Sequence, residues 1–253
     1  MGSERIGLDV ITVVTSPAIG FDLTRESVMQ LHDLNPNVRW IVIVLEANDV
    51  IDSELLIAVR QLGDQLVHRS QTGRGIYGAM NEALPFVEND FFMFLNSGDS
   101  AQGSLVDQLP HLNNQRVHCY KSSWHDVSGI SRNGPLFSGR VSFMFGKMPN
   151  HQAMVFPGNL STNKYDETFP IAADQDMKLT LFCSQLLEFH SNIMVSSLVG
   201  GASSRKLKLH EVKDRYFESR KIFLRHYSSA WAEILGVYYG IRFLTRLNYS
   251  FRR

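Results

Sequence analysis

The sequence predicts an α/β fold in which a mostly parallel central sheet carries helices on its faces. Apolar runs of strand length occupy residues 10–15, 40–45 and 91–95, and continuous apolar runs are typical of parallel strands buried on both faces. Stretches with helical apolar spacing lie between these runs. Strands that alternate with helices in this way indicate a doubly wound parallel sheet.

The first hundred residues give these elements in order. Helices are expected over 23–34, 53–62 and 77–87, and a short further strand over 66–69. The helix over 53–62 should begin after Ser53 as its N-cap and stop at Gly63, because serine caps helix N-termini and glycine adopts the left-handed conformation that ends them.

Beyond Asp99 the periodicity weakens, and the expected elements are shorter. We predict strands at 116–120, 154–156 and 193–198, a helix over 174–189, a flexible loop at 200–204 and a helical pattern from residue 211 onward. The chain is therefore divided into a main domain over 1–204 and a helical extension over 205–253.

The composition is that of a soluble globular protein, with 44% hydrophobic and 20% charged residues. No run reaches the roughly 18 uninterrupted apolar residues of a membrane-spanning helix, and the N-terminus shows no signal-peptide pattern. The two cysteines, Cys119 and Cys183, fit neither a metal-binding spacing nor a disulfide framework. We therefore expect a reducing, cytoplasmic location.

A net charge of zero hides two oppositely charged parts. Residues 205–253 carry 12 Lys and Arg against 4 Asp and Glu, whereas the remainder carries 13 against 21. The tail segments 220–225 and 231–243 interleave basic and aromatic residues, which is typical of a helix lying on a membrane surface. The alternative is a helix packed on the main domain or on another subunit of a homo-oligomer. Nucleic acid is not expected as a partner, because the body is acidic.

The apolar strand at 91–95 ends abruptly in Asn96-Ser97-Gly98-Asp99. Ligands of open α/β sheets bind at the carboxyl ends of the strands. A carboxylate there suits Mg²⁺ or Mn²⁺, which take oxygen ligands and share them with phosphates. The alternative is a surface turn with Asp99 as an N-cap.

Residues 73–78 match the pattern G-x-G-x-x-G between a strand and a helix, and Asp99 follows 21 positions after Gly78. This is the outline of a dinucleotide-binding fingerprint, and it would make the protein an NAD- or FAD-dependent oxidoreductase. Two features disfavour that reading: the motif lies in the third strand–helix unit, and Asp99 lies beyond a glycine turn.

Several short segments occur in the order that they have in glycosyltransferase family 2. Residues 75–81 (GIYGAMN) and 95–99 (LNSGD) resemble the G-I-Y-D-A-M-N and F-L-N-S-G-D segments of bacterial colanic-acid and other surface-polysaccharide transferases. Residues 150–154, 165–167 and 171–176 resemble the family's H-Q-A-M, Y-D-E and A-x-D-x-D segments. The resemblance covers roughly residues 9–205.

The resemblance implies a GT-A fold and a catalytic domain over 1–204. The implied activity is that of an inverting hexosyltransferase, which moves a sugar from a nucleoside-diphosphate sugar to a glycan acceptor. That acceptor would be lipid-linked, in bacterial surface polysaccharide synthesis on the inner face of the cytoplasmic membrane. Asp99 would be the metal carboxylate for Mn²⁺ or Mg²⁺, and Asn96 would take the place of the family's first acid.

Asp174 matches the catalytic base of the family, and Asp176 would be its supporting carboxylate. A carboxylate within hydrogen-bond reach of the acceptor hydroxyl can take its proton. On a helix, two side chains at this spacing diverge, whereas on a loop both could face the cleft. The alternative for either aspartate is helix N-capping.

Further residues are predicted to bind the substrates. For the donor nucleotide they are Thr15, Glu46, Arg74, Asn81, Asn96 and Ser97, and for the acceptor or a phosphate they are His151, Gln152 and Ser203. Arg74 could equally be a solvated loop residue, and His151 a core histidine. Gly200-Gly201 with Ser203 would form either a lid over the donor or a plain linker.

Three positions depart from the family pattern. Glu46 follows a strand that usually ends in an aspartate, and glycine replaces aspartate at Gly73 and Gly78. These changes leave open a second function, that of a catalytically inactive homologue that binds nucleotide sugars.

Overall fold

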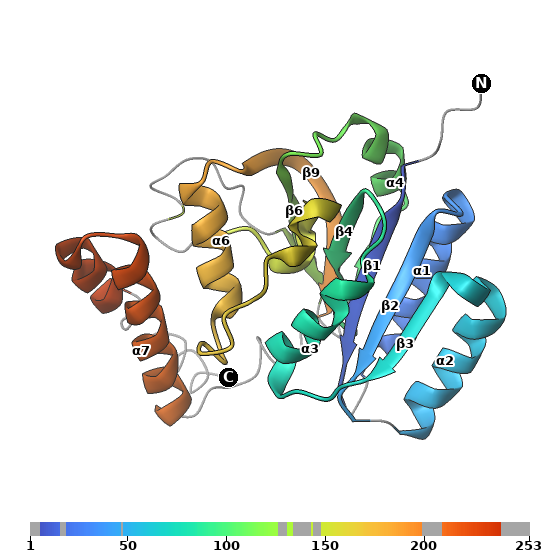
Figure 1. The fold of residues 1–253 in the computed structure, drawn as a ribbon, viewed down its shortest axis with the longest axis horizontal. Coiled ribbons are helices and arrows are strands. Elements are labelled where there is room, and N and C mark those ends of the chain that lie inside the picture. Colours follow the sequence, from blue (N-terminus) through green and yellow to red (C-terminus); the bar gives the residue numbers. More distant parts are fainter. Residues whose placement is uncertain are drawn as a thin grey trace.

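The computed structural model describes residues 6–15, 19–46, 48–125, 131–133, 143, 148–198 and 209–238. Within these ranges nine strands form one mixed sheet, in the order β3-β2-β1-β4-β8-β6-β9-β5 with β7 paired to β6 (Figure 1). The strands are β1 Leu8–Val14, β2 Val38–Val44, β3 Leu66–Ser70, β4 Phe91–Phe94, β5 Asp99–Ala101, β6 Val117–His125, β7 Ser131–Asn133, β8 Met154–Pro157 and β9 Leu187–Leu198.

The predicted parallel sheet is confirmed for the first half of the chain, where β3, β2, β1 and β4 are all parallel. The second half is mixed: β8 runs antiparallel to both β4 and β6, while β6 and β9 are parallel to each other. This half of the chain lacks the regular strand–helix alternation that long parallel crossovers require.

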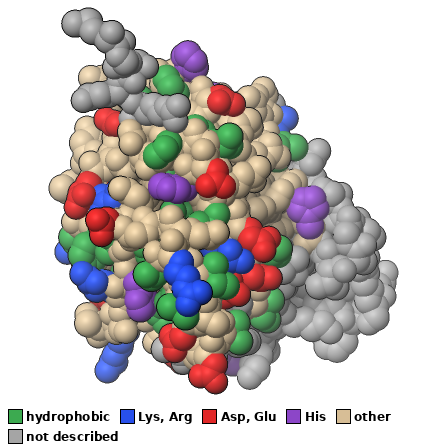
Figure 2. All heavy atoms as spheres, turned by 90° about the vertical axis from the view of Figure 1, so that its right-hand side faces the viewer, with side chains coloured by type: hydrophobic (Ala, Val, Ile, Leu, Met, Phe, Trp, Pro, Cys, Tyr) green, Lys and Arg blue, Asp and Glu red, His purple; other side chains and the backbone are tan. Residues whose placement is uncertain are grey.

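Helices cover both faces of the sheet (Figure 1). Alternate strand residues point to opposite faces, so that Trp40 and Val42 join the core under α1 and α2, whereas Ile41 and Ile43 join the core with α3 and α6. Figure 2 shows the side on which α1 and α2 lie, where acidic, basic and apolar side chains are interspersed. The helices are α1 Phe21–Leu34, α2 Asp49–Leu62, α3 Gly75–Ala83, α4 Ser104–Gln108, α6 Ala173–Cys183 and α7 Leu209–His226, with residues 229–238 also helical.

Several predicted helix ends were wrong. Helix α3 covers Gly75–Ala83, followed by a 3₁₀ turn over Leu84–Phe86, rather than 77–87. Helix α2 begins at Asp49 because Asn48, not Ser53, caps it: the Asn48 side chain accepts a hydrogen bond from the backbone N–H of Ile51. Its predicted end at Gly63 is confirmed, and this glycine has a φ of 52°. Helix α6 ends at Cys183 rather than 189, because the residues from Leu187 onward pair with β6.

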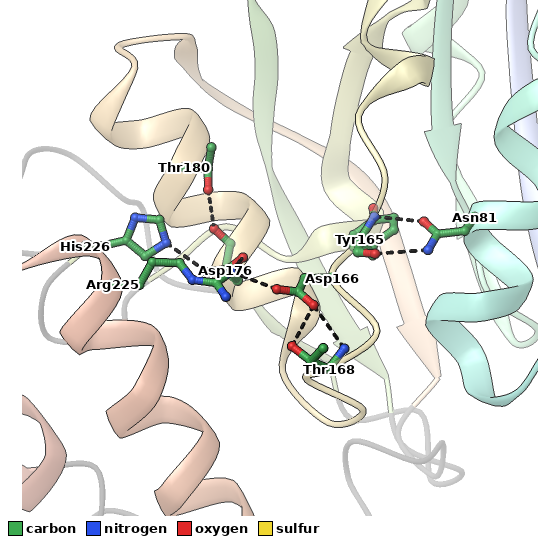
Figure 3. Close-up of polar contacts among 8 residues, drawn as sticks. All are labelled: Asn81, Tyr165, Asp166, Thr168, Asp176, Thr180, Arg225 and His226. Atoms are coloured by element: carbon green, nitrogen blue, oxygen red, sulfur yellow. Dashed lines mark hydrogen bonds and ion pairs between the residues drawn. The ribbon is translucent and has the colours of Figure 1, made fainter.

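Helix α7 packs against α6 through buried apolar residues and through polar contacts to Asp176 (Figure 3). Asp176 of α6 accepts hydrogen bonds from Arg225 and His226 of α7, each at 2.9 Å. Among the described helices, none combines the length and the apolar character that crossing a bilayer requires.

Candidate functional site

Four of the residues predicted to bind the donor lie just beyond the carboxyl ends of the parallel strands. Thr15 directly follows β1, Glu46 lies just beyond β2, Arg74 follows β3, and Asn96 follows β4. Strand register places these ends side by side, since Val14 pairs with Val44 and Val44 with Ser70. The Thr15, Glu46 and Arg74 side chains are exposed there. Their roles toward a ligand stay predictions.

The turn from Asn96 to Asp99 is held in place by helix α1. The Thr24 hydroxyl accepts a hydrogen bond from the N–H of Gly98 at 3.0 Å and lies 2.8 Å from the carbonyl oxygen of Asp99. Gly98 has a φ of 90°, which a residue with a side chain rarely adopts. Ser97 bonds the carbonyl of Ile19 at 3.2 Å. The turn is therefore fixed before any ligand binds.

The Asp99 carboxyl group is buried, with only 8% of the residue exposed. Burial raises its pKa to about 7, although hydrogen bonds from the Ser197 side chain and the Asn96 backbone lower it. On the same turn, the side-chain oxygen Oδ1 of Asn96 is buried and has no hydrogen-bond partner among the described residues. The carboxyl group and the amide both offer oxygen atoms that can serve as metal ligands. This turn therefore fits a divalent cation.

Asp174 lies in the first turn of α6 and is held by two side chains. The Tyr77 hydroxyl of α3 donates to its Oδ1 at 2.7 Å, and Lys178 Nζ lies 2.6 Å from its Oδ2. Burial alone would raise the pKa of Asp174, but the charge of Lys178 and the hydrogen bonds lower it below the usual range of a carboxyl group. The side chain keeps 29% of its surface exposed, so this ionised carboxylate is still open to solvent.

Asp176 points away from Asp174, because both residues lie within the helix and their side chains diverge. Figure 3 shows Asp176 directed at α7, where Arg225 and His226 bind it. Neither aspartate is the N-cap of α6, since that position is Ala172. The structure thus separates the two aspartates: Asp174 contacts Tyr77 and Lys178, whereas Asp176 lies in the contact between α6 and α7.

His151 lies in the core, as its alternative reading allowed. Only 5% of the residue is exposed, its ring stacks on Phe94 with centroids 4.9 Å apart, and its Nε2 bonds the Tyr165 hydroxyl. Burial and the nearby charge of Lys178 lower the pKa of His151 to about 3, so the ring is neutral. Gln152 is half-buried on the same short turn.

A series of contacts connects the surroundings of Asp99 with those of Asp174. Next to His151, the Asn150 side-chain amide approaches the Ser197 hydroxyl at 3.4 Å, and Ser197 in turn bonds Asp99. At its other end, His151 contacts Tyr165, whose ring packs 5.5 Å from that of Tyr77, the partner of Asp174. These contacts link the residues around Asp99, the predicted metal carboxylate, to the residues around Asp174, the predicted base.

Asn81 bonds protein atoms on both sides of its amide. Its oxygen accepts from the backbone N–H of Tyr165, and its nitrogen donates to the Tyr165 carbonyl (Figure 3). The nitrogen also donates to Glu167 Oε1 at 2.8 Å. A Cβ at Gly78 would lie 3.5 Å from Glu167 Oε2. Glu167 therefore places a carboxylate close to where the family pattern has an aspartate on α3.

The loop before α3 is closed by Glu82. Its carboxylate accepts hydrogen bonds from the backbone N–H groups of Thr72 and Gly73, the latter at 2.5 Å. A dinucleotide fingerprint requires such N–H groups to face a pyrophosphate, and here a carboxylate already binds them. This geometry disfavours the oxidoreductase reading. Ser203 and Gly200-Gly201 lie outside the described residues.

Sequence reasoning missed several side chains that shape the site, among them Tyr77, Lys178 and Ser197. Lys178 carried a readable signal, because a lysine four residues after Asp174 on a helix forms an ion pair. Nothing in the sequence indicated that the Lys178 side chain would be buried. The approach of Ser197 to Asp99 depends on antiparallel pairing of β5 with β9, which local sequence does not encode.

The fold places the chain among GT-A-like structures. Neither a scan against protein-family models nor a search of curated proteins finds a match. The solved structures that it resembles include TarS of S. aureus, with a TM-score of 0.66 and 15% identity over 95% of this chain and 43% of that chain. TarS 1-349 in complex with UDP-GlcNAc gives a TM-score of 0.65 at 15% identity, covering 95% of this chain and 72% of that one.

A third similar structure is the mannosyltransferase PcManGT from Pyrobaculum calidifontis in complex with GDP-Man and Mn²⁺. Its TM-score is 0.60 at 12% identity, over 97% of this chain and 73% of that one. These likenesses confirm the GT-A fold that the sequence predicted. This chain spans less than half the length of the TarS chain in the first comparison.

Proposed function

We propose that this protein is a glycosyltransferase that moves a hexose from a nucleoside-diphosphate sugar to a glycan acceptor with inversion at the sugar carbon. The observation that carries the proposal is the turn from Asn96 to Asp99. Beside the carboxyl ends of the parallel strands, it presents a buried carboxyl group and an amide oxygen that no described residue binds. The GT-A fold supports it, and solved structures with that fold were obtained with UDP-GlcNAc or with GDP-Man and Mn²⁺.

Asp99 would hold a divalent cation, Mn²⁺ or Mg²⁺, with Asn96 Oδ1 as a neutral second oxygen. Such an ion, when bound, neutralises the charge that develops on a departing diphosphate. Ser197 and the Asn96 backbone orient the Asp99 carboxylate by hydrogen bonds. Thr15, Glu46, Arg74 and Ser97 lie along the same edge of the sheet and would contact the donor.

Asp174 would act as the base that accepts the proton of the acceptor hydroxyl. Tyr77 and Lys178 hold its carboxylate at 2.7 and 2.6 Å, so the group is oriented before the acceptor arrives. Exchanging Asp174 for Asn should leave donor binding intact and remove transfer. Retained transfer in that variant would move the base to another residue.

The experiment that tests the donor site is thermal stabilisation by UDP, GDP, dTDP, CMP and NAD, each with and without Mn²⁺. A ligand at about 100 times its dissociation constant raises the free energy of unfolding by roughly 2.7 kcal/mol. We expect an Mn²⁺-dependent shift with one nucleoside diphosphate and its loss in Asp99→Asn. A shift with NAD alone, independent of Mn²⁺, would overturn the proposal.

One observation favours a second function, the binding of nucleotide sugars without transfer. The ion pair with Lys178 stabilises the ionised form of Asp174, and a carboxylate with a lowered pKa is a weaker base. The two functions separate in one assay, in which Mn²⁺-dependent donor binding is measured beside product formation with glycan acceptors. Binding without product across the acceptor panel would favour the second.

We further propose that the extension contacts the cytoplasmic face of a membrane that carries a lipid-linked acceptor. Trp231, Ile234 and Val237 are each about half exposed on one side of the helix over 229–238. Two basic residues of the extension form ion pairs within the protein, Arg220 with Glu233 and Arg225 with Asp176. The proposed membrane contact therefore rests on the exposed apolar side chains rather than on these two arginines. Co-sedimentation with anionic vesicles, compared between the protein and Trp231→Ser, tests this contact.

A further inference from the structure

A second cluster of metal-ligating side chains lies at the opposite end of β9 from the candidate active site. His118 on β6 pairs in register with Glu188 on β9, and His190 follows two residues later. Ser197, which bonds Asp99, lies seven residues beyond His190, or on the order of 20 Å at 3.3 Å per residue. The cluster is therefore separate from the residues that would bind the donor.

The three side chains converge closely. His118 Nδ1 lies 2.9 Å from His190 Nε2, while the Glu188 carboxylate lies 3.9 Å from the former and 3.8 Å from the latter. Two imidazole nitrogens bound tetrahedrally to Zn²⁺ at about 2.0–2.1 Å lie roughly 3.3 Å apart. A shift of about half an ångström in each side chain would bring the three ligand atoms to that geometry.

The tautomer of His118 suits a ligand. Its Nε2 lies 3.0 Å from the backbone carbonyl oxygen of Asn113, which can only accept, so Nε2 carries the proton. In the neutral ring, Nδ1 then presents its lone pair toward His190 and Glu188. A backbone carbonyl that fixes the second ring nitrogen is the usual support of a metal-binding histidine.

The surroundings of the cluster give an independent indication. Tyr120 is only 2% exposed and its ring stacks on His190 with centroids 4.6 Å apart, yet its hydroxyl has no hydrogen-bond partner among the described residues. The strand pairing is also irregular beyond Cys119, where β9 has extra residues opposite β6. Such bulges redirect side chains and are frequent near functional sites.

We propose that His118, Glu188 and His190 bind a borderline transition-metal ion of the Zn²⁺ class, with a fourth position open to water. Two imidazoles and one carboxylate suit Zn²⁺, Fe²⁺ or Co²⁺ better than Mg²⁺, which takes oxygen ligands. Glu188 completes the set, because its carboxylate oxygens already lie 3.9 Å from His118 Nδ1 and 3.8 Å from His190 Nε2. The bound ion would link the N-terminal ends of the neighbouring strands β6 and β9.

The test is Zn²⁺ binding by chelator-treated protein, measured by equilibrium dialysis with metal analysis, and Co²⁺ absorption as a report on geometry. We expect about one equivalent of Zn²⁺, with affinity falling more than about 100-fold in His190→Ala, because loss of a mere supporting residue already costs 10- to 100-fold. Glu188→Gln should weaken binding too. His111→Ala, which changes an exposed histidine near the start of β6, is the matched control.

His190 and Glu188 are only partly buried, so their variants should fold, which unfolding curves would verify. Asp99→Asn should keep the Zn²⁺ equivalent, which separates this site from the proposed donor site. The proposal is overturned if the protein takes up no Zn²⁺. It is also overturned if His190→Ala and Glu188→Gln bind as much as His111→Ala.

Discussion

Lys178 Nζ lies 2.6 Å from the carboxylate of Asp174, one helical turn away on α6. The Lys178 side chain is only 8% exposed, whereas that of Asp174 is 29% exposed. The lysine therefore depends on this carboxylate to compensate a nearly buried charge, while the carboxylate still reaches solvent. The candidate base and the stability of the first turn of α6 are consequently coupled.

We expect that coupling to be measurable in a double-mutant cycle. Asp174→Asn leaves the Lys178 ammonium without its counter-charge, and breaking a buried pair in this way costs about 3 kcal/mol of unfolding free energy. Adding Lys178→Met to that variant removes the uncompensated charge, so the double variant should be more stable than Asp174→Asn alone. Urea unfolding of the four proteins gives the result, and additive costs would contradict the coupling.

The pH dependence of stability should reveal Asp99. Its pKa is about 7 in the folded protein against 3.8 in an unfolded chain. Between these values the native state holds a proton that the unfolded state has lost, so stability falls as pH rises through this window. The loss attributable to Asp99 is about 4 kcal/mol.

Asp99→Asn should remove that loss, so without metal the variant should be more stable than the parent at pH 8 but not at pH 4. Mn²⁺ should stabilise the parent at pH 8 and leave the variant unchanged. Asp107→Asn, an exposed aspartate on the next helix, is the control that should shift neither profile. Parallel pH profiles for the parent and Asp99→Asn would contradict the burial of this carboxyl group.

The sequence predicted the parallel half of the sheet because its strands are uninterrupted apolar runs separated by helices. It did not predict the antiparallel pairing of β8, β6 and β5, since those partners are distant in the chain and their segments lack periodicity. Long-range pairing also overrode the helical pattern that was expected to run to 189. Register, unlike burial, depends on the partner strand.

For the site, the residue pattern placed Asn96, Asp99 and Asp174 as candidates, and the structure shows the environments on which their roles depend. His151 is buried and its ring packs on Phe94, which agrees with the core alternative, while its role toward a ligand stays a prediction. Helical geometry separated Asp174 from Asp176. Such distinctions require the packing of α3, α6 and α7, which no local motif specifies.

Asp176 should matter more for stability than for the chemical step. Its side chain is 10% exposed and accepts from both Arg225 and His226, so Asp176→Asn should cost about 2 kcal/mol. Asp166→Asn is the matched control, because Asp166 pairs with the same arginine but is 30% exposed, and exposed pairs contribute at most about 1 kcal/mol. Urea unfolding measures the loss of unfolding free energy in each variant, and we expect the larger loss in Asp176→Asn. A fall in kcat for Asp176→Asn without lost stability would place this carboxylate at the substrate.

Gly78 lies inside α3, where glycine is less favourable than alanine by about 0.5–1 kcal/mol. An added Cβ would meet only ordinary contacts, 3.5 Å from Gln71 and from Glu167. Gly78→Ala should therefore raise the unfolding free energy by about that amount. Urea unfolding measures it, and a loss of stability would show that the space beside Gly78 is smaller than the structure indicates.

Gly78→Asp extends this test to the carboxylate of Glu167. A second negative charge beside Glu167 should cancel the gain that alanine brings, because like charges at short range destabilise the folded state. Combining Gly78→Asp with Glu167→Gln removes the repulsion, and the pair should be more stable than Gly78→Asp alone. If the two changes are simply additive, then Glu167 does not occupy the space that an aspartate at position 78 would need.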